Sequence, residues 1–229
     1  MRSIVFDTGP IISLTTNNLL WLLEPLKRKY KGHFHITPDV RRELIDRPLQ
    51  TKKFKFEALQ VMTYINDGIL EIVENDDIEQ KTNKLLSLAN NIFKAFGKYM
   101  QIIHRAEMSA VASSLHYKGQ AVVVDERTTR VIIENPKKLV NILRHTLHTN
   151  IEVNQSNLND FAKLTKGIRM IRSAELVTVA YELGLLNKYL ANIPSPKKTL
   201  LESVLWGVKL QGCAISKKEV EQLVRMEIK

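Results

Sequence analysis

Cysteine is almost absent from this sequence, and long apolar runs are missing altogether. Cys213 is the only cysteine among 229 residues, which excludes an intramolecular disulfide and a metal cluster built on several cysteines. No apolar stretch is long enough to span a bilayer. No charged-then-apolar leader precedes the first apolar run at 3–6, so no signal peptide is expected. The sequence therefore indicates an intracellular, cytoplasmic protein with no membrane partner.

Positive charge is what the sequence has in excess. The 34 Lys and Arg residues outnumber the 24 Asp and Glu residues, which gives a formal net charge of +10. Such an excess favours a polyanionic partner, usually nucleic acid, although many lysine-rich proteins present only a solvated surface. Basic residues cluster in KRKYKGH from Lys27, in RR at 41–42 and in KKFKF from Lys52. Aromatic residues within these clusters can stack bases or pack in the core.

Short apolar runs alternate with longer amphipathic stretches. The predicted strands are SIVF (3–6), HFHIT (33–37), ILEIVE (69–74), AVVV (121–124) and IEV (151–153). The predicted helices cover 18–30, 38–46, 54–66, 78–96, 104–117, 127–134 and 137–147. Strands that alternate with connections of this length predict an α/β fold, in which a parallel sheet is sandwiched by helices.

The strand signals stop after about residue 155. Three helical patterns follow, at 173–190, 196–210 and 216–226. We therefore predict an α/β domain at 1–154 and a small helical C-terminal extension at 155–229. An apolar stripe from Leu201 to Val208 predicts that the extension covers the sheet domain or a dimer partner. Because it holds none of the candidate acids described next, we interpret it as structural and not as part of the chemistry.

Acidic residues stand where the predicted strands end. Asp7 directly follows the first strand, and Asp125 directly follows the fourth. Ligands of a parallel α/β sheet bind at the carboxyl ends of its strands, so both carboxylates are expected at one edge. Glu43 and Glu107 lie near the starts of two helices that begin at that same edge. The geometry of the predicted sheet thus brings four carboxylates together.

Four neighbouring carboxylates repel one another and raise each other's pKa, and a divalent cation relieves this repulsion. Mg²⁺ and Mn²⁺ take oxygen ligands from a few carboxylates and waters, and they can activate water for attack on a phosphodiester. Asp7 and Asp125 are the expected direct ligands, because strand ends are rigid. Each acid alone has a simpler explanation, since Asp after a strand often caps a helix and Glu43 could lie on the surface. The joint pattern favours a metal-dependent nuclease.

Two other enzyme classes place an acid after an apolar run. An aspartic protease carries Asp-Thr-Gly, as at 7–9, but it needs an all-β fold and a second or dimer-shared motif, whereas this chain is helix-rich and has one. A haloacid-dehalogenase phosphatase needs a second Asp two residues after the first, and Gly9 occupies that position. Both classes are disfavoured.

Four segments together resemble the PIN-domain family of metal-dependent nucleases: IVFDTGPIISL, TPDVRREL, HRAEMSAVASSL and AVVVDERTTRVI. The resemblance covers residues 3 to about 153. It implies a parallel sheet of strand order 3-2-1-4-5, an Mg²⁺ or Mn²⁺ site and hydrolysis of RNA phosphodiester bonds. The catalytic and metal-binding residues that it implies are Asp7, Glu43, Glu107 and Asp125. Thr8 matches a small polar position beside the first acid, and Thr128 would serve similarly near the fourth.

Several partners remain open under this resemblance. The basic residues expected to contact RNA are Lys52, Lys53, Lys55, Arg127 and Arg130. For Arg127 and Arg130, a solvated surface position explains the sequence equally well. Toxin members of the family are usually shorter, so an antitoxin or other protein partner and a homodimer stay undecided. The extension resembles the endings of archaeal PIN-like proteins. The main alternative is a PIN fold that serves as a non-catalytic RNA-binding or assembly module, against which the four intact acids argue.

Overall fold

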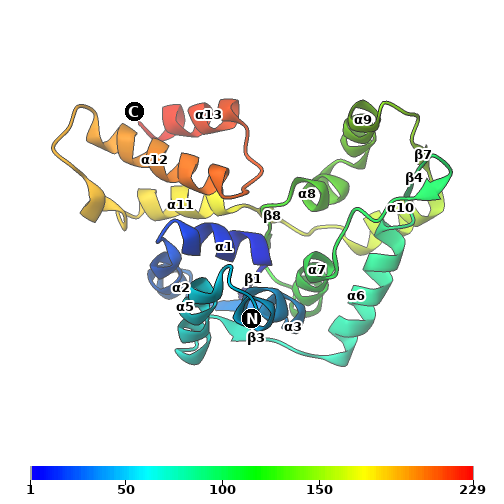
Figure 1. The fold of residues 1–229 in the computed structure, drawn as a ribbon, viewed down its shortest axis with the longest axis horizontal. Coiled ribbons are helices and arrows are strands. Elements are labelled where there is room, and N and C mark those ends of the chain that lie inside the picture. The colour runs from blue at the N-terminus through cyan, green and yellow to red at the C-terminus, as the bar shows by residue number, and fades with distance from the viewer. Residues whose placement is uncertain (1, 229) are drawn as a thin grey trace.

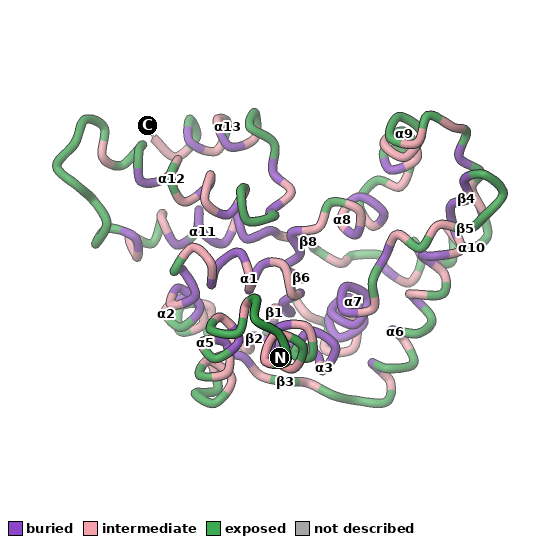
Figure 2. Tube along the Cα trace, viewed as in Figure 1, coloured by how far each residue is buried: buried purple, intermediate pink, exposed green. Residues whose placement is uncertain are grey.

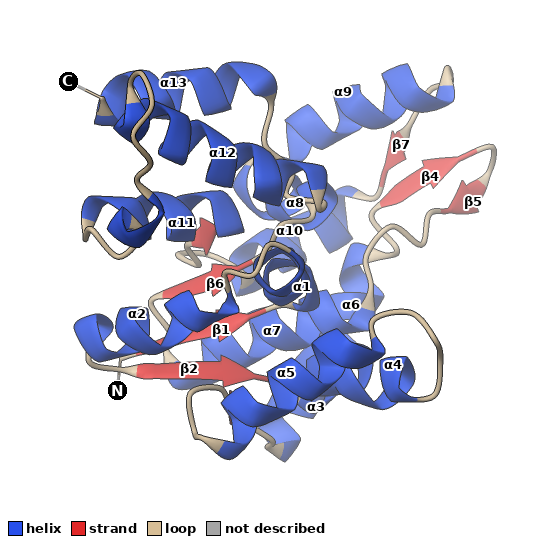
Figure 3. Ribbon diagram, turned by 60° about the vertical axis from the view of Figure 1, so that its left-hand side comes forward, coloured by secondary structure: helices blue, strands red, loops and turns tan. Residues whose placement is uncertain are grey.

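A five-stranded parallel sheet lies at the centre of the computed structural model, which describes residues 2–228 (Figures 1 and 3). Its strands are β1 (Ser3–Phe6), β2 (His33–Ile36), β3 (Glu71–Ile72), β6 (Ala121–Val123) and β8 (Met170–Ile171). They lie in the order β3-β2-β1-β6-β8, and every neighbouring pair is parallel. Counted among themselves along the chain, these strands have the expected order 3-2-1-4-5. The predicted α/β class is confirmed.

The fifth strand of the sheet is not the predicted one. Residues 151–153 contribute β7 (Glu152–Val153) to a separate antiparallel sheet with β4 (Phe93–Ala95) and β5 (Lys98–Tyr99). The end of the helix predicted at 78–96 is therefore also wrong, because β4 occupies it. The edge strand β8 belongs instead to the segment assigned to a helical extension. That segment therefore contributes a strand to the sheet and is not purely helical.

Helices flank both faces of the parallel sheet (Figure 3). They are α1 (Thr8–Thr16), α2 (Leu23–Tyr30), α3 (Pro38–Arg41), α4 (Arg47–Leu49), α5 (Lys55–Asn66), α6 (Asp76–Ala89), α7 (Arg105–Tyr117), α8 (Arg127–Glu134), α9 (Pro136–Leu147), α10 (Gln155–Leu164), α11 (Ser173–Glu182), α12 (Pro196–Leu210) and α13 (Lys217–Glu227). Short 3-10 turns span Leu20–Leu22 and Asn187–Tyr189, and a π-helical turn at Arg42–Asp46 joins α3 to α4. No helix within residues 2–228 is long and apolar enough to cross a membrane.

Helix α1 is a helix that the sequence did not predict, and it matters because it starts at the first acid. Asp7 takes the extended N-cap conformation, with φ −81° and ψ 170°. Pro10 follows in the first turn, where its missing N–H leaves no helical hydrogen bond unmade. Gly9-Pro10 reads as a turn in the sequence, but here it lies inside a helix. Strand β1 and helix α1 therefore hold Asp7 rigidly between them.

The buried residues, purple in Figure 2, include two large hydrophobic cores. The first packs α1, α2, α11 and α12 against the sheet around Phe6, Phe34 and Leu201. Leu201, Leu205 and Val208 of the predicted stripe are all fully buried in it. The second core gathers Phe93 and Phe161 with residues of α6, α7, α8 and α9. Figure 1 shows the two groups of helices on opposite sides of the molecule, with the ends of the central strands between them.

Candidate metal centre

The four predicted acids line one pocket of about 620 Å³. Asp7 follows β1 and Asp125 lies just after β6, so both stand at the carboxyl ends of neighbouring strands. Glu43 lies in the π-helical turn after α3, and Glu107 lies in the first turn of α7. The sheet therefore brings the predicted quartet together at its carboxyl edge.

Of these carboxylates, Asp7 is the one whose negative charge its surroundings disfavour most. It is only 5% exposed, and its side chain forms no capping hydrogen bond to α1. Its buried Oδ1 atom has no hydrogen-bond partner among the described residues. Burial, followed by repulsion from Glu107 and Glu43, raises the pKa of Asp7 to about 7, although the backbone N–H groups of Thr8 and Gly9 lower it in part. Capping of α1 does not account for Oδ1, because this oxygen has no donor.

Glu107 is nearly as buried, at 7% exposed, but its Oε2 atom has partners. The hydroxyl of Thr129 and the backbone N–H of His104 both donate to it. Burial is the main cause that raises the pKa of Glu107 above its ordinary value. The supporting threonine is thus Thr129, which the sequence analysis missed. Thr128, expected to serve near the fourth acid, donates its hydroxyl to the adjacent Glu126, at Oε1, at 3.0 Å.

Glu126 is a fifth acid in the pocket that sequence reasoning did not select. It caps α8, accepting the backbone N–H of Thr129 at 2.9 Å. Its charge adds to the causes that raise the pKa of Glu107. The signal was present, because Glu126 directly follows Asp125, but the resemblance pointed only to the first acid of the pair. Its capping bonds make it a less available ligand than Asp7.

Asp125 differs from Asp7 because donors already surround it. Its Oδ2 accepts the hydroxyls of Ser13 at 2.9 Å and Ser173 at 2.7 Å, and its Oδ1 accepts the Ser173 backbone N–H at 2.8 Å. Only 2% of the residue is exposed. A carboxylate offers about four lone-pair sites, so three donors leave little room for a cation. The expectation that Asp125 is a leading direct ligand is therefore weaker than the same expectation for Asp7.

The C-terminal segment, expected to be structural and outside the chemistry, reaches this pocket. Ser173 at the start of α11 holds Asp125, and the backbone N–H of Ala214 donates to the Asp125 carbonyl at 2.9 Å. Gln211 and Gly212, after α12, line the pocket. These contacts join residues that are far apart along the chain, so no local sequence pattern predicts them.

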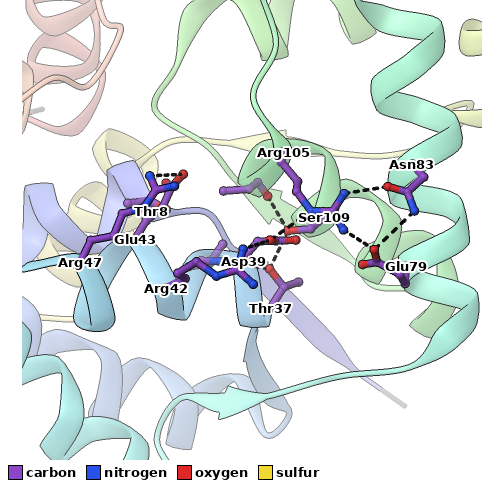
Figure 4. Close-up of polar contacts among 12 residues, drawn as sticks. Thr8, Thr37, Asp39, Arg42, Glu43, Arg47, Glu79, Asn83, Arg105 and Ser109 are labelled. Carbon is purple, nitrogen blue, oxygen red and sulfur yellow. Dashed lines mark hydrogen bonds and ion pairs between the residues drawn. The ribbon is translucent and has the colours of Figure 1, made fainter.

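Glu43 is held from two sides, as Figure 4 shows. The Thr8 hydroxyl, expected to lie beside the first acid, donates to Glu43 Oε2 at 2.9 Å. Arg47 Nη1 lies 3.9 Å from Glu43 Oε1 and also lines the pocket. Arg47 is a cation of the site that the sequence analysis did not single out.

A second polar network beside the pocket fixes the start of α7 (Figure 4). Arg105 Nε donates to Asp39 of α3 at 3.1 Å, and Arg105 Nη1 donates to Asn83 of α6 at 2.7 Å. The same guanidinium also contacts Glu79. Because Glu107 lies two residues after Arg105, this network holds the third acid of the quartet in place.

The basic residues proposed to contact RNA do not line the pocket. Lys52 and Lys53 are exposed between α4 and α5, Lys55 begins α5, and Arg127 is exposed at the start of α8. Arg130 is half-buried, with Nε 3.9 Å from Glu134. These side chains could contact a ligand only where it extends beyond the acids.

Another group of residues that could hold a metal ion lies elsewhere, at His33, His35 and Glu71. One possible ligand atom from each lies within 4.8 Å of the others. His33 Nδ1 is 2.8 Å from Glu71 Oε2, and Lys27 Nζ is 2.5 Å from Glu71 Oε1. The ammonium group of Lys27 already neutralises this carboxylate, so the group is balanced as an ion-pair network. The sequence analysis did not predict it.

Comparisons with protein-family models, with curated proteins and with solved structures give no match to this chain. Fold and site define its class: a parallel α/β protein with an acidic pocket at the carboxyl edge of its sheet.

Proposed function

We propose that this chain is a metal-dependent endoribonuclease of the PIN type, which cuts RNA in the cytoplasm at the acidic pocket. The observation that carries the proposal is the buried, unpartnered Oδ1 of Asp7. Burial, together with repulsion from Glu107 and Glu43, raises the pKa of Asp7 to about 7. An orphaned buried carboxylate oxygen is costly unless a cation or proton satisfies it. A set of carboxylate oxygens fits Mg²⁺ or Mn²⁺.

Asp7, Glu43 and Glu107 would hold such an ion, with Asp125 bonded mainly to the protein. When bound there, a divalent cation supplies Lewis-acid activation of water and of the phosphate. Thr8 and Thr129 orient Glu43 and Glu107 through the hydroxyl bonds described above. Such pre-set ligands need no reorganisation when substrate arrives.

The acids alone would repel a polyanion, whereas Arg47 and the positive net charge attract one. Arg47 lines the pocket beside Glu43, where its guanidinium can donate to a phosphate oxygen and neutralise developing charge. The formal charge of +10 draws RNA toward the protein as a whole. A basic protein with an acidic pocket thus favours a phosphodiester as substrate.

The hydrogen bonds around Asp125 favour a second candidate, a PIN-like fold that binds RNA or assembles with a protein without cutting. Three donors satisfy this carboxylate with no ion. An antitoxin or a second copy of the chain would suit this role. The candidate requires no cleavage and no metal dependence, so one assay separates the two.

The assay follows cleavage of a 5′-labelled RNA with Mg²⁺ or Mn²⁺ and with excess chelator. Asp7→Asn should abolish the metal-dependent cleavage. Asp67→Asn, which changes an exposed acid after α5, is the matched control and should cut like the wild type. Cleavage that persists in chelator or in Asp7→Asn contradicts the nuclease proposal, and metal-independent binding with no cleavage favours the second candidate.

A further inference from the structure

A lobe beside the acidic pocket belongs to the second hydrophobic core and carries much of the positive charge. We define the basic lobe as residues 91–103 and 127–168, which contain β4, β5, α8, α9, β7 and α10. Its core residues Phe93, Leu139 and Phe161 pack with α6 and α7 in the second hydrophobic cluster. Figure 1 places the lobe on the far side of the molecule from α11, α12 and α13.

The net positive charge is concentrated in this lobe. Its 55 residues hold nine Lys and Arg and three Asp and Glu, a net +6 of the total +10. The other 174 residues hold 25 Lys and Arg and 21 Asp and Glu, a net +4. The basic residues of the lobe are Lys94, Lys98, Arg127, Arg130, Lys137, Lys138, Arg144, Lys163 and Lys166. Most of them are exposed, so the charge lies on the surface.

The hairpin of β4 and β5 presents aromatic rings within this charge. Lys94 pairs with Tyr99 across the hairpin, and Lys94 Nζ lies 4.6 Å from the centre of the Tyr99 ring. Phe96 at the turn is 76% exposed and has φ +52°. A bulky residue rarely adopts positive φ, and this one gains little burial in return. An exposed ring held in such a turn is available to a ligand.

We propose that the basic lobe is the docking surface for single-stranded RNA, with Phe96 and Tyr99 stacking on unpaired bases and the lysines contacting phosphates. Base stacking on aromatic residues within a basic surface is the usual means of holding single strands. A protein partner is disfavoured, because the cores of protein interfaces are depleted in lysine. Duplex RNA is disfavoured, because its stacked bases offer no free face to Phe96.

The lobe is continuous with the acidic pocket. Helix α8 begins at Arg127, directly after Asp125 and Glu126, which line the pocket. The lobe therefore begins next to the acids, at the start of α8. This inference states where the uncut part of the substrate lies, and so deepens the proposed function. It rests on that function for the choice of RNA.

The test measures binding of a labelled, unstructured 20-nucleotide RNA by fluorescence anisotropy in chelator across a range of KCl concentrations. Lys98→Gln/Lys137→Gln/Lys138→Gln should reduce the slope of log affinity against log salt by about 2, because each phosphate that a lysine neutralises contributes about 0.7 to the slope. Lys197→Gln/Lys198→Gln/Lys218→Gln removes three exposed lysines from α12 and α13 and is the matched control, with no change in slope expected.

Phe96→Ala tests the stacking, and its exposed position keeps the fold intact. It should weaken binding of the single strand about fivefold or more and leave the binding of a blunt duplex unchanged. Equal losses of affinity in the lobe and control triples, or full affinity in Phe96→Ala, would overturn the inference. Unchanged binding in the lobe variants, with metal-dependent cleavage by the wild type, refutes the docking surface alone. Weaker binding in the lobe variants, with no cleavage by the wild type, refutes only the nuclease.

Discussion

Ser173 donates two hydrogen bonds to Asp125, one from its backbone N–H to Oδ1 at 2.8 Å and one from its hydroxyl to Oδ2 at 2.7 Å. The two residues lie 48 positions apart, one at the end of a central strand and the other at the start of α11. The contact ties the C-terminal helices to the acidic pocket. Loss of either partner should therefore disturb both the packing and the site.

Ser173→Ala removes the hydroxyl bond and keeps the backbone bond. We expect a stability loss of about 1 kcal/mol, typical of one buried hydrogen bond, and a higher Mn²⁺ concentration for half-maximal cleavage. Ser173→Thr should restore the metal dependence. Urea unfolding and a metal titration of the cleavage rate check both effects. Ser203→Ala, on the exposed face of α12, is the control. An unchanged metal requirement in Ser173→Ala would show that the contact only stabilises the fold.

Asp7 predicts a pH dependence of stability in the metal-free protein. Its pKa is raised from 3.8 to about 7 by folding, so the folded state holds its proton more tightly than the unfolded state. The contribution of Asp7 to the free energy of unfolding is therefore most favourable below pH 3.8. It declines as pH rises and is fully lost above pH 7. Asp7→Asn removes this loss.

The measurement is urea unfolding of wild type and Asp7→Asn in chelator at pH 4 and pH 8. The variant should be more stable at pH 8 by on the order of a few kcal/mol and nearly equal at pH 4. Added Mn²⁺ should narrow the difference, because it stabilises the wild type. An Asp7→Asn protein that is less stable than wild type at pH 8 would contradict the account of the buried carboxylate.

Arg172 predicts the opposite pH dependence. Its guanidinium bonds Glu175, Glu219 and the Ala214 carbonyl, and it joins α11 to α13. Hydrogen bonds from Ser216 and Arg172 hold the pKa of Glu219 at about 2 against the effect of burial. This contribution to stability is present above the unfolded pKa near 4.5 and is lost as pH falls toward 2.

Arg172→Ala should therefore lower the melting temperature at pH 7 and flatten its decline between pH 4.5 and pH 2. Thermal unfolding followed by circular dichroism checks the profile. Arg28→Ala removes an exposed arginine paired with Glu24 and should change neither value. A profile for Arg172→Ala parallel to that of the wild type would show that the ion pairs contribute nothing measurable.

The central sheet was predictable where strands are long enough to carry a pattern. The sequence pattern predicts the four-residue strands β1 and β2 and the apolar run at β6. The two-residue edge strand β8 carries no periodicity, and its pairing with β6 is set by tertiary contacts. Its place was therefore given wrongly to residues 151–153, which form a strand in the other sheet.

The acids of the site were predictable because strand ends and helix starts share one edge of a parallel sheet. The groups that orient them were less so. Thr8 lies beside Asp7 and could be found, whereas Thr129, Arg47 and Ser173 reach the acids through helix phase or through contacts distant along the chain. Such contacts depend on the packed fold and leave no local motif.

The most direct test of the central claim is a crystal grown with Mn²⁺ and measured at the manganese edge. The account predicts an anomalous difference peak in the acidic pocket, within about 2.2 Å of oxygens of Asp7 and of a second acid of the quartet, and no such peak in Asp7→Asn. A pocket without a peak, or a peak only at His33, His35 and Glu71, would contradict it.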